Sequence, residues 1–355
     1  MKFGIMFFSS DCHVTAPHSL LLEVARFADR HGFTCIWTPE RHFNQFGGLF
    51  PNPSVLSAAL AMITERLQLR SGSLIAPLHD AIRIAEEWAL VDQLSAGRIA
   101  ISFGSGWNAN DFVFFPERYA RRQEIMYCQI DTIRALWRGE PLRRQNAFRK
   151  DVAITLYPKP VQEELPVWIT SSGNVDTFRS AGHRDANLLT HMITQDLYAL
   201  KDKISVYRRA RAERGFEPLR GIVSLMLHTF LGPSVKDVKG IVYRPFREYL
   251  RSAISLEQLA AQGGGVISGG FRHRGEALPP EKVEELLDLT FERYCEHAAL
   301  MGTVDSTAKF IHKLEVIGVD EIACLVDFGV TREQVFESLE YLVALKERCD
   351  IDAPI

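Results

Sequence analysis

Short apolar runs and longer amphipathic stretches alternate along this chain. A short, nearly continuous apolar run is typical of a strand that is buried on both faces. Such runs predict strands at residues 2–8, 35–38, 67–74, 99–103, 167–169, 186–189, 221–231 and 321–326. Apolar positions that recur every three to four residues predict amphipathic helices. These helices are expected at residues 17–31, 54–64, 80–94, 118–137, 175–181, 197–214 and 331–348.

The strand–helix alternation predicts an α/β fold with a parallel sheet, because parallel neighbours need a crossover connection of roughly a dozen residues or more. Eight such units close naturally into a (β/α)8 TIM barrel. A doubly wound open sheet is the alternative. A barrel places its chemistry on the loops that follow the strands. We expect a single domain that spans residues 1–355.

Insertions interrupt the alternation after strands 4 and 7. The first insertion, residues 143–165, contains the alternating sequence DVAITLYP and is expected to include a hairpin. The second, residues 234–300, is expected to be mostly helical. Within it, residues 262–280 are rich in glycine and carry the basic sequence RHR. We interpret this segment either as a lid over the barrel mouth or as an ordinary surface loop.

Composition narrows the class of protein. The chain has 355 residues and a formal net charge of −3, which argues against a strongly basic nucleic-acid-binding protein. No apolar run reaches the roughly 18 residues that a membrane-spanning helix needs, and the N-terminal sequence lacks the pattern of a secretory signal peptide. The six cysteines include no CxxC pair, and no HExxH or HxxxH spacing predicts a metal site. We therefore expect a soluble, cytoplasmic protein that binds no nucleic acid, membrane or metal.

Small and polar residues follow the second, third and fourth predicted strands. His42 is a candidate general base, because imidazole titrates near neutral pH; a histidine that is merely hydrogen-bonded in its loop is the alternative. Gly72 and Ser73 would let a flat ligand approach the backbone closely, although glycine also occurs where a strand simply bends. Ser105 and Gly106 would likewise expose the backbone to a ligand. The absence of a G-x-S-x-G sequence argues against a hydrolase.

The segment after the fifth strand is suited to bind a phosphate. It combines hydroxyl groups, a glycine and backbone N–H groups at the start of a helix, in the residues Ser171, Ser172, Gly173 and Asn174. Ordinary helix capping is the alternative. Arg121 or Arg122, at the start of the long helix, could donate charge-assisted hydrogen bonds to the same phosphate. His191 follows the sixth strand and also faces the expected barrel mouth.

Several segments together resemble the bacterial luciferase-like flavin-dependent monooxygenases. Residues 76–107 resemble the signature region of that family, and WTPERHF at 37–43 resembles the motif after its second strand. ERYARRQEIM, TSSGNVDTFRSAG and MGTVD resemble its arginine-bearing helix, its phosphate loop and a later turn. The matches occur in the family's order and extend from about residue 2 to residue 328. The phosphate loop is most similar to that of the subgroup associated with natural-product assembly lines.

The resemblance implies an enzyme with a barrel that binds FMN at its mouth. Members take reduced FMN from a separate flavin reductase and react it with O2, and the C4a-hydroperoxyflavin then oxygenates a substrate. By motif position Ser73 would lie against the flavin ring, at a strand end where the family often has a non-prolyl cis peptide, here Gly72–Ser73. Ser105 and Gly106 would line the cofactor. The phosphate would be held by Arg122, Ser171, Ser172, Gly173 and Asn174.

Two positions depart from the luciferases. Luciferases have two adjacent histidines after the second strand, the first of which is linked to catalysis. Here Arg41 occupies the first position and His42 the second. Ser105 stands where luciferases carry a phosphate-binding arginine, which leaves more of the phosphate charge to Arg122 and the helix terminus.

The hypothesis from sequence is an FMN-dependent two-component monooxygenase of natural-product biosynthesis, with a small-molecule or carrier-protein-tethered substrate. His42 is the candidate acid or base, and Arg41 or His191 would place the substrate. The alternatives are an oxidoreductase of the same barrel family that uses the deazaflavin F420, and a non-catalytic flavin-binding protein. We expect a homodimer. The arginine-rich stretch 118–150 could dock an acidic partner such as a carrier protein.

Overall fold

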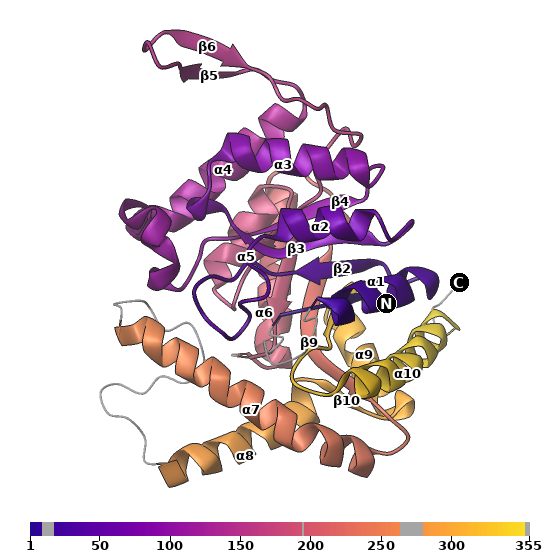
Figure 1. The fold of residues 1–355 in the computed structure, drawn as a ribbon. Helices are drawn as coiled ribbons and strands as arrows, with labels where there is room; N and C mark the ends of the chain where they lie inside the picture. The colour runs from indigo at the N-terminus through magenta and orange to yellow at the C-terminus, as the bar shows by residue number, and fades with distance from the viewer. Residues whose placement is uncertain (9–17, 194, 263–279, 352–355) are drawn as a thin grey trace.

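A closed barrel of parallel strands forms the centre of the molecule (Figure 1). The computed structural model describes residues 1–8, 18–193, 195–262 and 280–351. Within them the barrel strands are β1 (Lys2–Met6), β2 (Cys35–Thr38), β3 (Gln68–Ile75), β4 (Ile99–Gly104), β7 (Val167–Thr170), β8 (Asn187–His191), β9 (Val223–Leu231) and β11 (Glu321–Leu325). The ring closes because β1 pairs with β11, β11 with β9, and β9 with β8. The predicted (β/α)8 barrel is confirmed, and the open sheet is excluded.

Helices connect the strands and cover the outside of the barrel. They are α1 (Ser19–Arg30), α2 (Pro53–Ala61), α3 (Ala81–Leu94), α4 (Arg122–Trp137), α5 (Val175–His183), α6 (Leu197–Glu213), α9 (Val304–Val316) and α10 (Arg332–Ile351). Several of these helices have a polar N-cap residue. The side chains of Asp80, Asn174 and Asp196 each accept a hydrogen bond from a backbone N–H of the first turn. In the described part of the chain, no helix is both long and apolar enough to cross a membrane.

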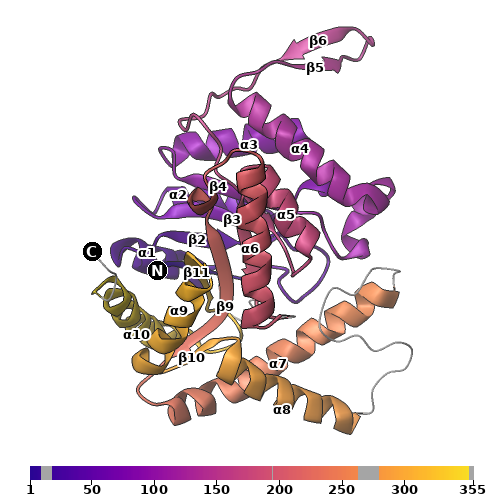
Figure 2. The same ribbon diagram turned by 180° about the vertical axis from the view of Figure 1, so that it is seen from behind.

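Two segments extend beyond the barrel, as Figures 1 and 2 show from opposite sides. The hairpin of β5 (Leu142–Gln145) and β6 (Asp151–Ile154) lies between α4 and β7 and stands away from the barrel. The helices α7 (Val235–Gln262) and α8 (Pro280–His297) follow β9 on the other side of the molecule. Of the lid segment expected at 262–280, residues 263–279 lie outside the described residues.

The region around residue 301 differs from the sequence expectation. Residues 301–305 were expected to form a turn, but β10 (Leu300–Gly302) pairs in parallel with the end of β9, and α9 begins directly after Thr303. Thr303 and Ser306 form a reciprocal capping box that starts this helix. The sequence analysis missed both elements: a strand of three residues is too short to show periodicity, and the interpretation of residues 301–305 as a turn hid the start of the helix.

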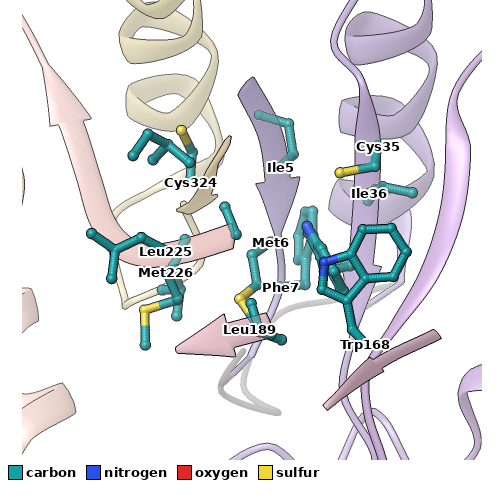
Figure 3. Close-up of a cluster of buried hydrophobic side chains, with 14 of the residues drawn as sticks. Ile5, Met6, Phe7, Cys35, Ile36, Trp168, Leu189, Leu225, Met226 and Cys324 are labelled. Carbon is teal, nitrogen blue, oxygen red and sulfur yellow. The ribbon is translucent and has the colours of Figure 1, made fainter. Parts of the chain in front are cut away.

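The barrel interior is filled by side chains from nearly every strand. Figure 3 shows buried hydrophobic side chains on or next to β1, β2, β7, β8, β9 and β11, and since successive side chains of a strand point to opposite faces, they cover both sides of the barrel wall: Ile5, Met6, Phe7, Cys35, Ile36, Trp168, Leu189, Leu225, Met226 and Cys324. A buried ion pair lies among them, with Arg70 Nη1 2.6 Å from Glu321 Oε1. The Arg70 guanidinium also stacks on Trp37 and Trp168, at 4.7 and 4.2 Å from their ring centroids. Because these side chains occupy the middle of the barrel, we expect a ligand at the ends of the strands.

Candidate functional site

A cavity of about 160 Å³ lies where β4 and β7 end. Its lining residues come from the loop after β4, the first two turns of α4, and the segment from the end of β7 to the start of α5: Ser105, Gly106, Trp107, Arg122, Gln123, Met126, Tyr127, Thr170, Ser171, Ser172, Asn174 and Thr177. Six residues predicted to bind the cofactor therefore line one cavity: Ser105, Gly106, Arg122, Ser171, Ser172 and Asn174. Gly173 belongs to the same loop and has a positive φ of 114°.

The electrostatics of this cavity favour an anion. The N-terminus of α5 borders it, and its aligned peptide dipoles attract negative charge. Arg122 lines the cavity, donates one hydrogen bond to the Tyr119 carbonyl at 2.9 Å, and has no carboxylate partner among the described residues. Its neighbour Arg121 instead pairs with Glu124 at 2.6 Å on the outer surface. The structure therefore places Arg122 at the cavity and Arg121 on the outer surface.

The phosphate loop is also tied down internally. Asn174 Oδ1 accepts the N–H of Asp176 at 2.8 Å, and Ser171 Oγ accepts the N–H of Gly173 at 3.3 Å. Asn174 therefore also caps α5, as the alternative interpretation of this segment expected. These hydrogen bonds hold the loop in place beside the cavity. On the opposite wall, Gly106 has a φ of 79°. A Cβ at this position would lie 2.8 Å from the Phe112 ring and 2.9 Å from Ile75, so the local backbone requires glycine.

A chain of hydroxyl groups connects the end of β3 to this cavity. Ser73 Oγ lies 2.6 Å from Thr170 Oγ1, which in turn lies 2.7 Å from Ser102 Oγ. Thr170 lines the cavity, so Ser73 is in contact with its wall. The Gly72–Ser73 peptide bond is cis, as the family resemblance implied. Thr170 begins the TSSGN sequence of the predicted phosphate loop, whereas Ser102 was not predicted to take part in the site.

A buried carboxylate organises the loop after β2. Glu40 is 3% exposed and lies two residues before His42. Its Oε1 lies 2.9 Å from His42 Nε2 and 2.6 Å from His79 Nε2, and its Oε2 accepts the N–H of Ile75 at 2.6 Å. Because Nε2 of His42 donates to Glu40, Nδ1 is the nitrogen of that ring that can accept a proton. Glu40 and His79 were missed by the sequence analysis.

The charges in this network are set by burial and by the shared hydrogen bonds. Burial raises the pKa of Glu40, but the hydrogen bonds from His42, His79 and Ile75 outweigh it and leave the pKa below its usual value. Burial lowers the pKa of His79, but the bond and the negative charge of Glu40 outweigh it and leave the pKa raised. Both shifts favour the charged forms of Glu40 and His79. Nearby, burial raises the pKa of Asp111 to about 6 despite the positive charges of His42 and Arg41.

Two further histidines of the described chain, His191 and His228, are neutral at pH 7. Burial, with a contribution from Lys203, lowers the pKa of His191 to about 4, and its Nδ1 accepts the N–H of Ile193 at 3.3 Å. Burial lowers the pKa of His228 on β9 to about 3. Its Nε2 has no hydrogen-bond partner among the described residues. His191 is thus suited to hydrogen-bond a substrate and poorly suited to accept a proton at neutral pH.

Comparison with known proteins identifies the family. Residues 1–321 match the family described as luciferase-like monooxygenase, so the chain belongs to that family. It is 30% identical over 320 residues to an FMNH2-dependent dimethylsulfone monooxygenase of Pseudomonas putida, covering 84% of this chain and 80% of that protein. It is 23% identical over 340 residues to the oxygenase component of a flavin-dependent trigonelline monooxygenase of Acinetobacter baylyi, covering 91% and 87%.

A solved structure has the same fold. A monooxygenase from Streptomyces bottropensis superposes with a TM-score of 0.80 at 19% identity, covering 99% of this chain and 100% of that one. The prediction of a luciferase-like flavin-dependent monooxygenase is confirmed by the family match and the relatives. The residues at the cavity fit the phosphate of a flavin mononucleotide, because they combine an arginine without a carboxylate partner in the described chain, hydroxyl groups and a helix N-terminus.

Proposed function

We propose that this chain is the oxygenase component of a two-component monooxygenase. It acts as a single domain in the cytoplasm, takes reduced FMN from a separate flavin reductase, uses O2 and oxygenates a small natural-product intermediate. The observation that carries the proposal is the phosphate-sized cavity at the barrel mouth, lined by the predicted cofactor-binding residues. The relatives named for reduced FMN and for an oxygenase component support the two-component arrangement.

Two groups of residues would hold the cofactor. Its phosphate would lie in the cavity, bound by Ser105, Arg122, Ser171, Ser172, Gly173 and Asn174. Its ring would lie toward Gly72, Ser73 and Gly106, which are joined to that cavity through Thr170 and the cavity wall. When bound, reduced FMN supplies the electrons with which O2 gives one oxygen atom to the substrate and the other to water.

His42 would move a proton at the barrel mouth. Glu40 fixes its ring through the 2.9 Å hydrogen bond to Nε2, which leaves Nδ1 as the atom that accepts or donates the proton. His79 donates a second hydrogen bond to the same carboxylate oxygen, at 2.6 Å, and so helps to fix Glu40 in the buried loop. His42 also packs edge-on against Phe114, with ring centroids 5.4 Å apart, and apolar rings beside a reacting group help to exclude water.

A homodimer is part of the proposal, and the surface of α2 and α3 supports it. The two helices lie side by side. They expose four large apolar side chains, two at α2 and two on α3: Val55, Met62, Leu90 and Leu94. A cluster of exposed apolar residues on adjacent helices is suited to pack against a second copy.

The arginine-rich stretch lends no support to a carrier-protein dock beside the site. Arg118 donates to the carbonyls of Pro77 and His79, and Arg134 donates to that of Arg184, so both serve the fold. Arg138, at the end of α4, pairs with Glu140, and Arg143, Arg144, Arg149 and Lys150 lie exposed on the β5–β6 hairpin. This hairpin follows the far end of α4, a helix of 16 residues and so about 24 Å long, whose first residue lines the cavity. A tethered substrate stays a hypothesis that a comparison of free and thioester-bound substrates would decide.

Turnover with defined cofactors tests the proposal. The purified protein is supplied with a flavin reductase, NADH, FMN and candidate natural-product intermediates under 18O2, and products are analysed by mass spectrometry. We expect one 18O atom in the product and full dependence on FMN. Tight binding of the deazaflavin F420 in place of FMN, with hydride transfer and no oxygen incorporation, would instead establish the alternative oxidoreductase. FMN binding with no product from any candidate would favour a non-catalytic flavin-binding protein.

A further inference from the structure

Arg41 carries a positive charge, and no residue in the described part of the chain forms an ion pair with it. Its guanidinium has five N–H donors, yet it forms no hydrogen bond or ion pair with a described side chain or carbonyl. The side chain is partly buried, and burial lowers its pKa. A buried cation without a partner is costly, so its retention calls for a ligand.

The fold holds this side chain in a defined place. The guanidinium carbon lies 4.5 Å from the ring centroid of Phe8 and 5.4 Å from that of Phe46. Gly47 leaves the space that the side chain needs, because a Cβ there would lie 2.9 Å from Arg41 Nε. The Arg41 backbone N–H donates to the Phe50 carbonyl at 2.9 Å. These contacts seat the cation but satisfy none of its side-chain donors.

Two other arginines that are buried or partly buried have carboxylate partners. Arg70 pairs with Glu321 at 2.6 Å, and Arg208 pairs with Asp320 at 2.7 Å. Near Arg41 the charged or titratable groups are Asp111 and Tyr249, which affect its pKa through space without forming an ion pair with it in the described structure. Asp111 is instead engaged by Asn108 Nδ2 at 2.9 Å.

The surroundings of Arg41 are aromatic. Phe8 and Phe46 contact each other edge-on, with ring centroids 6.3 Å apart. Phe46 in turn contacts Tyr249 of α7 at 5.2 Å. This aromatic wall therefore joins the loops after β1 and β2 to the inserted helix α7. Arg41 also adjoins Glu40, whose N–H donates to the Ser73 carbonyl at 3.0 Å, so the wall lies next to the strand end proposed to face the flavin ring.

We propose that Arg41 binds a carboxylate group of the substrate, whose planar or apolar body lies along the wall of Phe8, Phe46 and Tyr249. This inference rests on the proposed function, since it names the substrate class of that site. The planar guanidinium matches a carboxylate by two parallel hydrogen bonds, while stacking on aromatic rings leaves its edge available. The flavin phosphate has its own arginine, Arg122, in a separate cavity.

Binding of a matched pair of probes tests the proposal without turnover. Benzoate and benzamide have the same shape and differ in charge, and isothermal titration calorimetry at constant ionic strength measures the Kd of each for the full chain, with and without FMN. We expect wild-type protein to bind benzoate about tenfold or more tightly than benzamide. Arg41→Gln is expected to remove this preference while leaving benzamide binding unchanged, and Arg41→Lys to retain part of it. Arg121→Gln, an exposed arginine paired with Glu124, is the control and should behave as wild type.

Each outcome bears on the proposal. A wild-type protein that binds both probes equally or neither, or an Arg41→Gln variant that keeps the benzoate preference, contradicts it and leaves Arg41 as a solvated cation only. FMN titration and urea unfolding of each variant show whether the change is local, because Arg41→Gln should leave both unchanged. If the wild-type protein does not bind FMN, the proposed function is overturned. If it binds FMN but does not prefer benzoate to benzamide, only this inference is overturned.

Discussion

Replacing Glu40 by glutamine perturbs the hydrogen-bond network that holds His42. The carboxylate accepts three hydrogen bonds, from the imidazoles of His42 and His79 at Oε1 and from the Ile75 N–H at Oε2. Glutamine has the same shape but one acceptor oxygen and one NH2 group, so at least one of the three donors then faces another donor. Hydrogen bonds to charged groups contribute about 1.5–3 kcal/mol each. We therefore expect Glu40→Gln to lower the free energy of unfolding by about 1–3 kcal/mol.

The decrease in unfolding free energy caused by Glu40→Gln should depend on pH. The pKa of Glu40 is lowered from 4.5, so its contribution to stability is present above that value and is lost as the pH falls through the lower folded pKa. The pKa of His79 is raised from 6.5, so its contribution is complete below that value and is lost as the pH rises through the higher folded pKa. The ion pair is thus fully formed between the two values. Glu40→Gln should destabilise the protein more near pH 6 than near pH 9.

Urea unfolding and product formation are the assays for this variant. Besides the stability loss, we expect the rate of oxygenated product to fall by about 10²-fold, because His42 loses its fixed orientation, with the FMN affinity retained. Glu86→Gln, which changes an exposed carboxylate of α3, is the matched control and should match wild type. The reasoning is refuted if Glu40→Gln unfolds at the wild-type urea concentration at both pH values and forms product at the wild-type rate.

Three further substitutions test the cofactor cavity and the surface. Arg122→Ala should weaken FMN binding by about 10- to 100-fold, because a charge-assisted contact to the phosphate is lost. Arg121→Ala should leave FMN binding unchanged, and equal effects of the two substitutions in a fluorescence titration would contradict the assignment. Gly106→Ala should lower the unfolding free energy by about 1–3 kcal/mol, since alanine is strained at positive φ and its Cβ has no room, and an unchanged thermal midpoint would count against this. If the proposed homodimer forms through α2 and α3, Leu90→Glu should give a monomer in light scattering, while Leu289→Glu, at an exposed position of α8, should leave the dimer intact.

The barrel could be predicted because its strands are short apolar runs separated by helices with clear periodicity. Residues 35–38 form the predicted strand without change, and other strands shift by a residue or two at their ends. α9 and β10 escaped prediction for a different reason. The sequence from Met301 was interpreted as a loop motif, and the capping box of Thr303 and Ser306, which starts a helix there, was not considered.

Only part of the candidate site could be predicted from the sequence. Loops after strands four and five could be assigned to one mouth, because a parallel barrel brings all such loops to the same end. Without the family resemblance, which assigned Arg122, the choice between Arg121 and Arg122 could not be made, since it depends on which side of the helix start faces the cavity. Glu40 and His79 meet across 39 positions of the chain. No local pattern indicates that contact, although a glutamate two residues before a candidate histidine deserves to be considered as its hydrogen-bond partner.

The central claim is that the flavin phosphate lies in the cavity beside Arg122 and the N-terminus of α5. Comparing the affinities of FMN and riboflavin by fluorescence titration tests it most directly, because the two ligands differ only in that phosphate. The account predicts that FMN binds wild-type protein about tenfold or more tightly than riboflavin and that Arg122→Ala removes most of this difference. Equal affinities of the wild type for the two flavins would contradict it.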